Sequence, residues 1–124
     1  MDTHILLWAA QDSPRLSSSS RALLESGREQ VYFSVANIWE VVIKSGLRRD
    51  NFRVNPERLR SAALLAGYDE LPIRGAHVLA VDGLPGLPAD PFDRILLAQA
   101  GVEQLQLLTV DRAVLAYGRP AVEA

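Results

Sequence analysis

The sequence contains no cysteine, which excludes disulfides, thiolate metal sites and cysteine nucleophiles. It has only two histidines, His4 and His77, and they lack the spacing of metal ligands. Because His77 falls in an apolar helical pattern, we interpret it as a core histidine with satisfied hydrogen bonds. No apolar run approaches the roughly 18 residues that span a bilayer, and the segment ILLWAA is too short and too closely flanked by acids for a signal peptide. We therefore expect a cytoplasmic protein without a membrane partner.

The chain also has little net charge, −2 at pH 7, which argues against a surface coated for binding polyanions. Twelve of its thirteen basic residues are arginine, the side chain suited to bidentate phosphate contacts. One short span, with only Asp50 and Glu57 as acids, holds many of them: Lys44, Arg48, Arg49, Arg53, Arg58 and Arg60. We favour a solvated loop and helix face as the interpretation of this span. A local patch that contacts phosphates through Arg48, Arg49 and Arg53 stays open.

Short apolar runs alternate along the chain with helical patterns. Strands are predicted at residues 31–35, 70–73 and 105–110. Helices are predicted at residues 3–11, 17–27, 36–47, 55–68, 74–85, 90–104 and 111–118, with Ser17, Asn55 and Asp90 as N-caps. A chain of 124 residues is long enough for one domain with a sizeable core. Alternating strands and helices predict an α/β fold with a parallel sheet covered on both faces.

Four acidic residues follow predicted strands or begin the helices behind them. Asp111 comes directly after the last strand, and Asp2 precedes the first helix, where a first strand ought to have ended. Glu40 lies about one and a half turns into the helix after the first predicted strand. Asp93 is the third residue of its helix. In a parallel sheet these positions face one edge, at which ligands bind.

Each acid taken alone has an ordinary explanation as a helix cap, a complement to the helix dipole or a surface charge. An ordinary role of this kind explains Glu40 least well, because NIWEVVI surrounds it with bulky apolar residues and a buried unpaired carboxylate is costly. Asp90 fits it best, as the cap of a helix with Pro91 at its first position. Carboxylates crowded at one edge raise one another's pKa unless a cation neutralises them. Oxygen ligands select Mg²⁺ or Mn²⁺ rather than zinc, and such an ion suits phosphodiester hydrolysis.

Four segments resemble the successive motifs of PIN-domain ribonucleases, specifically the VapC-type toxins of bacterial toxin–antitoxin pairs. They are DTHILLWA, SVANIWEVVIKSGL, DPFDRILLAQA and LLTVDRAVLAYG, and they follow at family-like spacing over almost the whole chain. The resemblance implies an α/β/α sandwich, Mg²⁺- or Mn²⁺-dependent endonuclease activity on RNA, homodimerisation, and neutralisation by a cognate antitoxin. The resemblance also implies that the family's four acidic site residues, its acidic quartet, correspond to Asp2, Glu40, Asp93 and Asp111, the same residues that their positions in the predicted fold indicate. Thr109 matches a hydroxyl position that often supports the site in this family.

The chain departs from the family pattern at two places. The family usually has several apolar residues before its first acid, which form the central strand, whereas only Met1 precedes Asp2 here. Two explanations stay open, a start further upstream or a truncated central strand. Close relatives often carry a histidine and a basic residue just before DPFDR, where this chain has Pro88 and Ala89. A substrate contact from those two positions is therefore missing.

Two other functions compete with the nuclease interpretation. A phosphoacceptor receiver domain also uses strand-end acids and Mg²⁺, but it needs a lysine at the end of a late strand. The only lysine, Lys44, lies on a helix after an early strand, which argues against this function. The second alternative is a degenerate, non-catalytic module that binds a protein partner, and the short segment before Asp2 favours it. Metal-dependent RNA cleavage by the purified chain separates a nuclease from such a module.

Overall fold

Helices alternate with short strands in the computed structural model, which describes residues 1–47 and 54–124. The helices are α1 (Thr3–Ala10), α2 (Ser18–Glu25), α3 (Val35–Gly46), α4 (Pro56–Leu65), α5 (Gly75–Val81), α6 (Pro91–Glu103) and α7 (Arg112–Leu115). The strands are β1 (Tyr32–Ser34), β2 (Asp69–Leu71), β3 (Leu107–Thr109) and β4 (Ala121–Glu123). The predicted α/β fold with parallel strands is confirmed. Neither described range contains a helix of the length and apolar character needed to cross a membrane.

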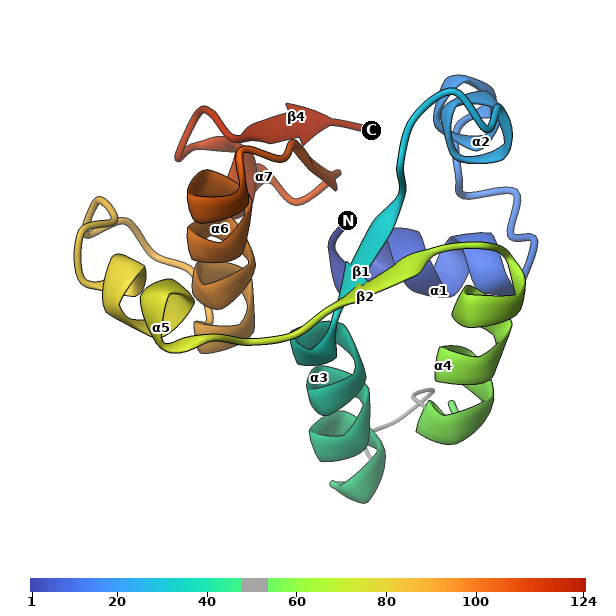
Figure 1. Ribbon diagram of the computed structural model, residues 1–124, viewed down its shortest axis with the longest axis horizontal. Helices are drawn as coiled ribbons and strands as arrows, with labels where there is room; N and C mark the ends of the chain where they lie inside the picture. The colour runs from blue at the N-terminus through green and yellow to red at the C-terminus, as the bar shows by residue number, and fades with distance from the viewer. Residues whose placement is uncertain (48–53) are drawn as a thin grey trace.

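The strands form two parallel pairs rather than one continuous sheet. β1 pairs with β2, with Phe33 opposite Glu70, and β3 pairs with β4, with Leu108 opposite Val122. Figure 1 shows β1 and β2 side by side in the middle of the molecule, with the N-terminus between β1 and the segment that carries β4. The sequence did not predict β4, because a run of three residues, AVE, has no measurable periodicity and depends on β3 as its partner.

Polar residues fix the points at which the helices begin. Ser34 ends β1 and caps α3: its Oγ accepts the N–H of Ala36 at 2.9 Å, while its own N–H donates to Asn37 Oδ1 at 2.7 Å. Such a capping box satisfies backbone donors at both residues. The predicted caps Ser17, Asn55 and Asp90 are confirmed, since each accepts a hydrogen bond from the first turn of its helix. Local sequence therefore sets where the helices after the strands start.

Each strand pair has its own hydrophobic core. Leu6, Phe33 and Val41 belong to a core that joins α1, β1, α3 and α4. A second core surrounds α6, β3 and β4, and it includes Leu97 and Val114. The split of the apolar side chains into two cores follows the split of the strands into two pairs.

His77 of α5 is fully buried and has both ring nitrogens occupied. Its Nδ1 accepts the N–H of Arg74 at 2.9 Å, and its Nε2 lies 2.8 Å from a carboxylate oxygen of Glu103 on α6. The contact joins α5 to the far end of α6. The interpretation of His77 as a satisfied core histidine is confirmed.

Candidate functional site

Asp2 ties the start of the chain to the end of β3. Its backbone N–H donates to the carbonyl of Leu108 at 3.0 Å. Its Oδ1 caps α1 by accepting the N–H of Ile5 at 3.0 Å, and its Oδ2 accepts the hydroxyl proton of Thr109. These three bonds hold the buried Asp2 carboxylate at the carboxyl end of β3.

Thr109, the last residue of β3, orients two of the predicted acids. Its hydroxyl donates to Asp2 and accepts the backbone N–H of Asp111 at 3.0 Å. Asp111 in turn caps α7, because its Oδ1 accepts the N–H of Ala113 at 2.8 Å. The Thr109 side chain is fully buried, so its hydroxyl is held in place between Asp2 and the first turn of α7.

Glu40 approaches the same edge from α3 and is buried. Its Oε1 accepts the hydroxyl proton of Thr3 at 2.5 Å, and its Oε2 pairs with the ammonium of Lys44 one turn further along α3. Thr3 also accepts a hydrogen bond from the side-chain amide of Asn37 at 3.0 Å. A carboxylate buried in this apolar segment thus has the charged and polar partners that its burial requires.

Asp93 stands in the first turn of α6, where Asp90 is the N-cap and accepts the Asp93 N–H at 2.8 Å. The assignment of Asp90 to capping is confirmed. Burial, followed by the negative charges of Asp90, Glu40, Asp111 and Asp2, raises the pKa of the Asp93 carboxyl to about 7. In the two described ranges no hydrogen bond or ion pair reaches the Asp93 carboxylate oxygens. The negative charges of the other three acids therefore act on the Asp93 carboxyl, and no hydrogen bond or ion pair from the described residues offsets their effect.

The four acids lie close enough for their charges to act on Asp93, but they do not form a ligand set. Among the described residues, no three or more histidine, aspartate or glutamate side chains are placed to hold a metal ion. Glu40 is paired with Lys44, while Asp2 and Asp111 each use one carboxylate oxygen as a helix cap. The arrangement therefore supplies oxygen donors and negative charge, and the donors are partly occupied by the protein.

Sequence reasoning missed Thr3 and Asn37, which orient Glu40. Both are polar residues inside otherwise apolar segments, the same signal that singled out Glu40, and both are buried. An aromatic pair also went unnoticed: Trp39 packs edge to face on Phe92 with ring centroids 5.0 Å apart. Trp39 is 51% exposed, so the pair forms a partly open aromatic surface beside the helix positions of Glu40 and Asp93.

The predicted phosphate contacts Arg48, Arg49 and Arg53 lie outside the described residues. Within the same basic span, Arg60 forms an ion pair with Glu70 through a Nε–Oε2 distance of 2.6 Å. Glu70 belongs to β2, so this arginine joins α4 to a strand. Part of the basic span is thereby assigned to a contact within the protein.

Asp93→Asn should remove a pH-dependent loss of stability from the metal-free protein. The pKa of the Asp93 carboxyl rises from 3.8 to about 7 on folding, so its contribution is complete below the lower value and is lost as the pH rises through the upper one. After allowance for solvent screening, we expect the free energy of unfolding of the wild type to fall by about 1–2 kcal/mol as the pH rises through this window. Urea unfolding in EDTA, at about pH 5 and about pH 8, measures the difference.

Asp82→Asn is the matched control, because Asp82 is an exposed aspartate at the end of α5. It should keep the wild-type dependence of unfolding free energy on pH. The same dependence in Asp93→Asn would contradict the electrostatic account of the site.

The chain is similar to known proteins in sequence and in fold. A sequence model of the PIN domain matches residues 1–119. The fold is similar to that of a chain in the crystal structure of VapBC2 from Rickettsia felis bound to a DNA fragment from their promoter, with a TM-score of 0.67, 15% sequence identity, and coverage of 98% of this chain and 93% of that chain. No match was found among curated protein sequences. Since the matched residues span nearly the whole chain and carry all four acids, the chain belongs to the PIN-domain family.

Proposed function

We propose that this protein is a divalent-metal-dependent endoribonuclease that acts as the toxin of a toxin–antitoxin pair. PIN domains are generally nucleases and typically use divalent metals, and the family match gives this coarse class. RNA as the substrate, Mg²⁺ or Mn²⁺ as the ion, and hydrolysis of a phosphodiester are our additions. The residues assigned to metal binding and catalysis are Asp2, Glu40, Asp93 and Asp111.

The PIN-domain match over residues 1–119 is the observation that carries the proposal, and the raised pKa of Asp93 supports it. The pKa of the Asp93 carboxyl is about 7, raised first by burial and then by the negative charges of Asp90, Glu40, Asp111 and Asp2, so the protein concentrates negative charge around it. Such an arrangement lowers stability, and perturbed carboxylates of this kind gather at functional sites. A bound divalent cation would neutralise the repulsion and let a protein of net charge −2 hold a polyanion near its carboxylates.

The chemistry of the donors fits a hard cation. All four side chains offer carboxylate oxygens, the ligands that Mg²⁺ and Mn²⁺ prefer. When bound, such an ion supplies an activated water and stabilises charge on the leaving oxygen. The protein's own contribution is orientation: Thr109 holds Asp2, and Thr3 holds Glu40. Complete ligation by the quartet requires Glu40 to exchange Lys44 for the cation.

RNA recognition would use surfaces around the acids. Bases of single-stranded RNA stack on aromatic side chains, and the half-exposed Trp39 beside Phe92 offers such a surface. Phosphate contacts by Arg48, Arg49 and Arg53 are part of the same proposal. Both features would let the strand lie across the site with a phosphate near the carboxylates.

The toxin role rests on the fold. The structural neighbour comes from a VapBC2 structure bound to promoter DNA, and by analogy we assign a cognate antitoxin as partner and a homodimer as the assembly. A segment of the antitoxin that carries an arginine or lysine would pair with the acidic site and compete with metal and substrate. Lys44 makes an ion pair of the same kind within the chain, since its ammonium pairs with the Glu40 carboxylate.

A degenerate, non-catalytic module that binds a protein partner is the second candidate. The Glu40–Lys44 ion pair favours it, because an internal cation already neutralises one of the four acids. The lack of a placed group of three or more ligands among the described residues points the same way. Metal-dependent cleavage decides between the two functions.

The purified chain should cleave RNA with Mg²⁺ or Mn²⁺, and Asp93→Asn should reduce the rate by at least about 100-fold, as expected for loss of a group that stabilises transition-state charge. The ion should also raise the melting temperature of the wild type, since a ligand at about 100 times its dissociation constant adds about 2.7 kcal/mol of stability. Asp93→Asn should lose most of that gain, whereas Asp82→Asn should keep both the activity and the gain. A metal-dependent thermal shift without cleavage would favour the degenerate module.

Neutralising the basic span tests the RNA contact. The triple change Arg48→Gln, Arg49→Gln and Arg53→Gln should weaken RNA binding across sequences. It should also make log affinity depend less steeply on log salt concentration, by the amount expected for the loss of up to about three phosphate contacts. The metal-dependent thermal shift should stay intact, because the quartet is untouched. Unchanged RNA affinity in a filter-binding or anisotropy titration would assign these arginines to a solvated surface or a protein contact.

Expression in a bacterial host tests the toxin role. The chain alone should slow growth, and co-expression of a small protein encoded next to it should restore growth. Asp93→Asn should be tolerated without that partner, because the nuclease would be inactive. Normal growth with abundant soluble wild-type protein would contradict the toxin assignment.

A further inference from the structure

The ammonium of Lys44 occupies one carboxylate oxygen of a proposed metal ligand. It pairs with Oε2 of Glu40 across one turn of α3, while Oε1 of Glu40 accepts the hydroxyl proton of Thr3 at 2.5 Å. Lys44 is the only lysine in the chain. The other three acids of the quartet have no ion pair within the two described ranges. The structure therefore has an internal cation on one of the four acids.

The two partners of this ion pair differ in how freely they can move. The Glu40 side chain is 5% exposed, whereas that of Lys44 is 34% exposed. Thr3 holds Oε1 of Glu40, and Asn37 in turn donates to the Thr3 hydroxyl at 3.0 Å. Lys44 reaches the pair from the last turn of α3 through a flexible four-carbon stem. If the pair separates, the lysine is the partner that leaves.

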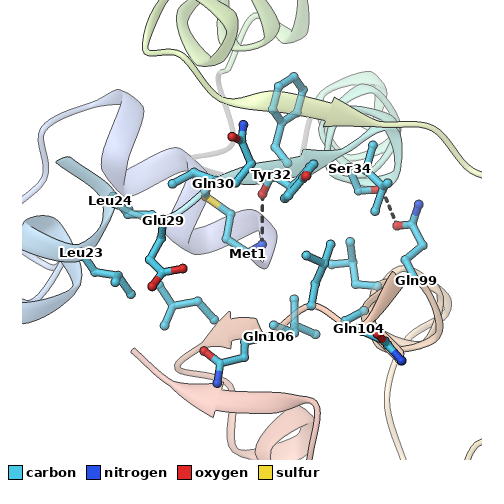
Figure 2. A pocket seen from close by; sticks show the side chains of 18 residues that line it. Met1, Leu23, Leu24, Glu29, Gln30, Tyr32, Ser34, Gln99, Gln104 and Gln106 are labelled. Atoms are coloured by element: carbon cyan, nitrogen blue, oxygen red, sulfur yellow. Dashed lines mark hydrogen bonds between the residues drawn. The ribbon is translucent and has the colours of Figure 1, made fainter. Parts of the chain in front are cut away.

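The helix that carries both residues is anchored at its N-terminus, which keeps Glu40 in place. Ser34, the N-cap of α3, donates through Oγ to Oε1 of Gln99 on α6 at 2.5 Å. Figure 2 shows this bond in the wall of a pocket of about 530 Å³ that is also lined by Met1. The side-chain amide of Asn37 donates to the carbonyl of Met1 at 3.3 Å. These bonds fix the first turn of α3 against α6 and the first residue of the chain.

A monovalent ammonium compensates only part of the negative charge of the quartet. The pair with Lys44 neutralises Glu40 alone. A divalent cation carries twice that charge and takes oxygens from several carboxylates at once. Both cations use the same Oε2 of Glu40, so the binding of one excludes the other.

We propose that Lys44 is an internal counter-ion, which holds Glu40 in the metal-free protein and sets the concentration of divalent cation at which the quartet fills. The ammonium neutralises the buried carboxylate, and it releases Oε2 when its flexible side chain swings toward solvent. Lys44 is thus a positioning residue that acts through Glu40 and does not enter the reaction. The inference deepens the proposed function, on which it rests, by naming what regulates the site.

Two effects of opposite sign follow from this role. The free energy needed to separate the ion pair is subtracted from that of metal binding, so the apparent dissociation constant for the metal rises. Without the ammonium, Glu40 stays buried and uncompensated, which destabilises the metal-free protein. The same loss makes metal binding tighter, because no ion pair has to separate. A lysine with a structural role alone would stabilise the fold without weakening metal binding.

Lys44→Met tests the proposal in the full chain, with Mn²⁺ alone as the probe and no RNA present. Methionine keeps an unbranched side chain and removes the charge. In EDTA the variant should melt at least about 4 °C below the wild type, because Glu40 loses its counter-ion. Its dissociation constant for Mn²⁺, measured by isothermal titration calorimetry, should be at least about 10-fold lower than that of the wild type.

Two further variants serve as controls. Lys44→Arg keeps the positive charge, so its dissociation constant for Mn²⁺ should be within about threefold of the wild-type value or higher. Arg60→Met is the matched control, because it removes the same unit of charge from the ion pair between Arg60 and Glu70, which is not one of the four acids. It should leave the affinity for Mn²⁺ unchanged.

Side-chain NMR of the wild type gives a measurement that needs no variant. Because the chain has a single lysine, protein labelled with ¹³C,¹⁵N-lysine has one lysine ammonium signal. In EDTA its protons should exchange slowly with water, since the ammonium donates to a buried carboxylate. Mg²⁺, which is diamagnetic, should speed this exchange at least about 10-fold. The midpoint of the change should coincide with that of the Mg²⁺-dependent thermal shift.

The outcomes separate this inference from the proposed function. Tighter Mn²⁺ binding by Lys44→Met than by the wild type supports the inference. Binding by Lys44→Met alone also supports it but contradicts the nuclease, because the native lysine would then block the site. Equal affinities, or an ammonium signal that saturating Mg²⁺ leaves unchanged, would overturn the inference while a wild type that cleaves RNA keeps its function. Absence of Mn²⁺ binding in both proteins would overturn both. If Lys44→Met does not fold, the ammonium signal decides.

Discussion

The hydrogen bond from Thr109 to Asp2 joins the two ends of the sequence, and the candidate site depends on it. It connects residues 107 positions apart and is buried. With the bond from the Asp2 N–H to Leu108, it fixes the start of α1 at the carboxyl end of β3. Thr3 follows Asp2 and reaches Glu40, while the Thr109 hydroxyl also receives the N–H of Asp111. Three of the four acids are thus positioned through one threonine–aspartate contact.

The fourth acid, Asp93, lowers the stability of the folded protein. Asp2, Glu40 and Asp111 all have hydrogen-bond partners, and no buried side-chain nitrogen or oxygen in the described part of the chain is left without one. Asp93 is partly exposed and has no compensating cation among the described residues. Burial and the neighbouring negative charges raise the pKa of its carboxyl to about 7. Stability is lost where the protein gathers like charges, which is common at sites shaped by function rather than by packing.

Local chemistry explains what the sequence could predict. Asp90 was recognisable as a cap because Pro91 follows it, and His77 as a core residue because its helix is apolar; both are confirmed. Most helices and the first three strands were found from periodicity and caps. The ligand roles of Asp2, Glu40, Asp93 and Asp111 stay predictions, although the charges of the other three acids act on Asp93.

The remaining features depend on contacts between distant segments, which a single sequence does not reveal. β4 exists through its pairing with β3, and its three residues have no pattern of their own. The orienting roles of Thr3 and Asn37 appear only when α1 and α3 meet. The Glu40–Lys44 ion pair has the i,i+4 spacing of helix surface pairs, but the burial that strengthens it comes from the tertiary fold. The separation of the strands into two pairs is likewise a property of packing.

That separation bears directly on the geometry of the acids. Asp2 and Asp111 are anchored to β3, whereas Glu40 belongs to the helix that β1 leads into. The quartet is therefore divided between the two halves of the molecule, and the spacing of its carboxylates depends on how β1 and β3 are held together. At the site itself they are bridged by the first residues of the chain, through the bonds of Met1 and Asp2 and the contact of Thr3 with Glu40. The bonds made by the first residues of the chain therefore help to set the spacing of the carboxylates.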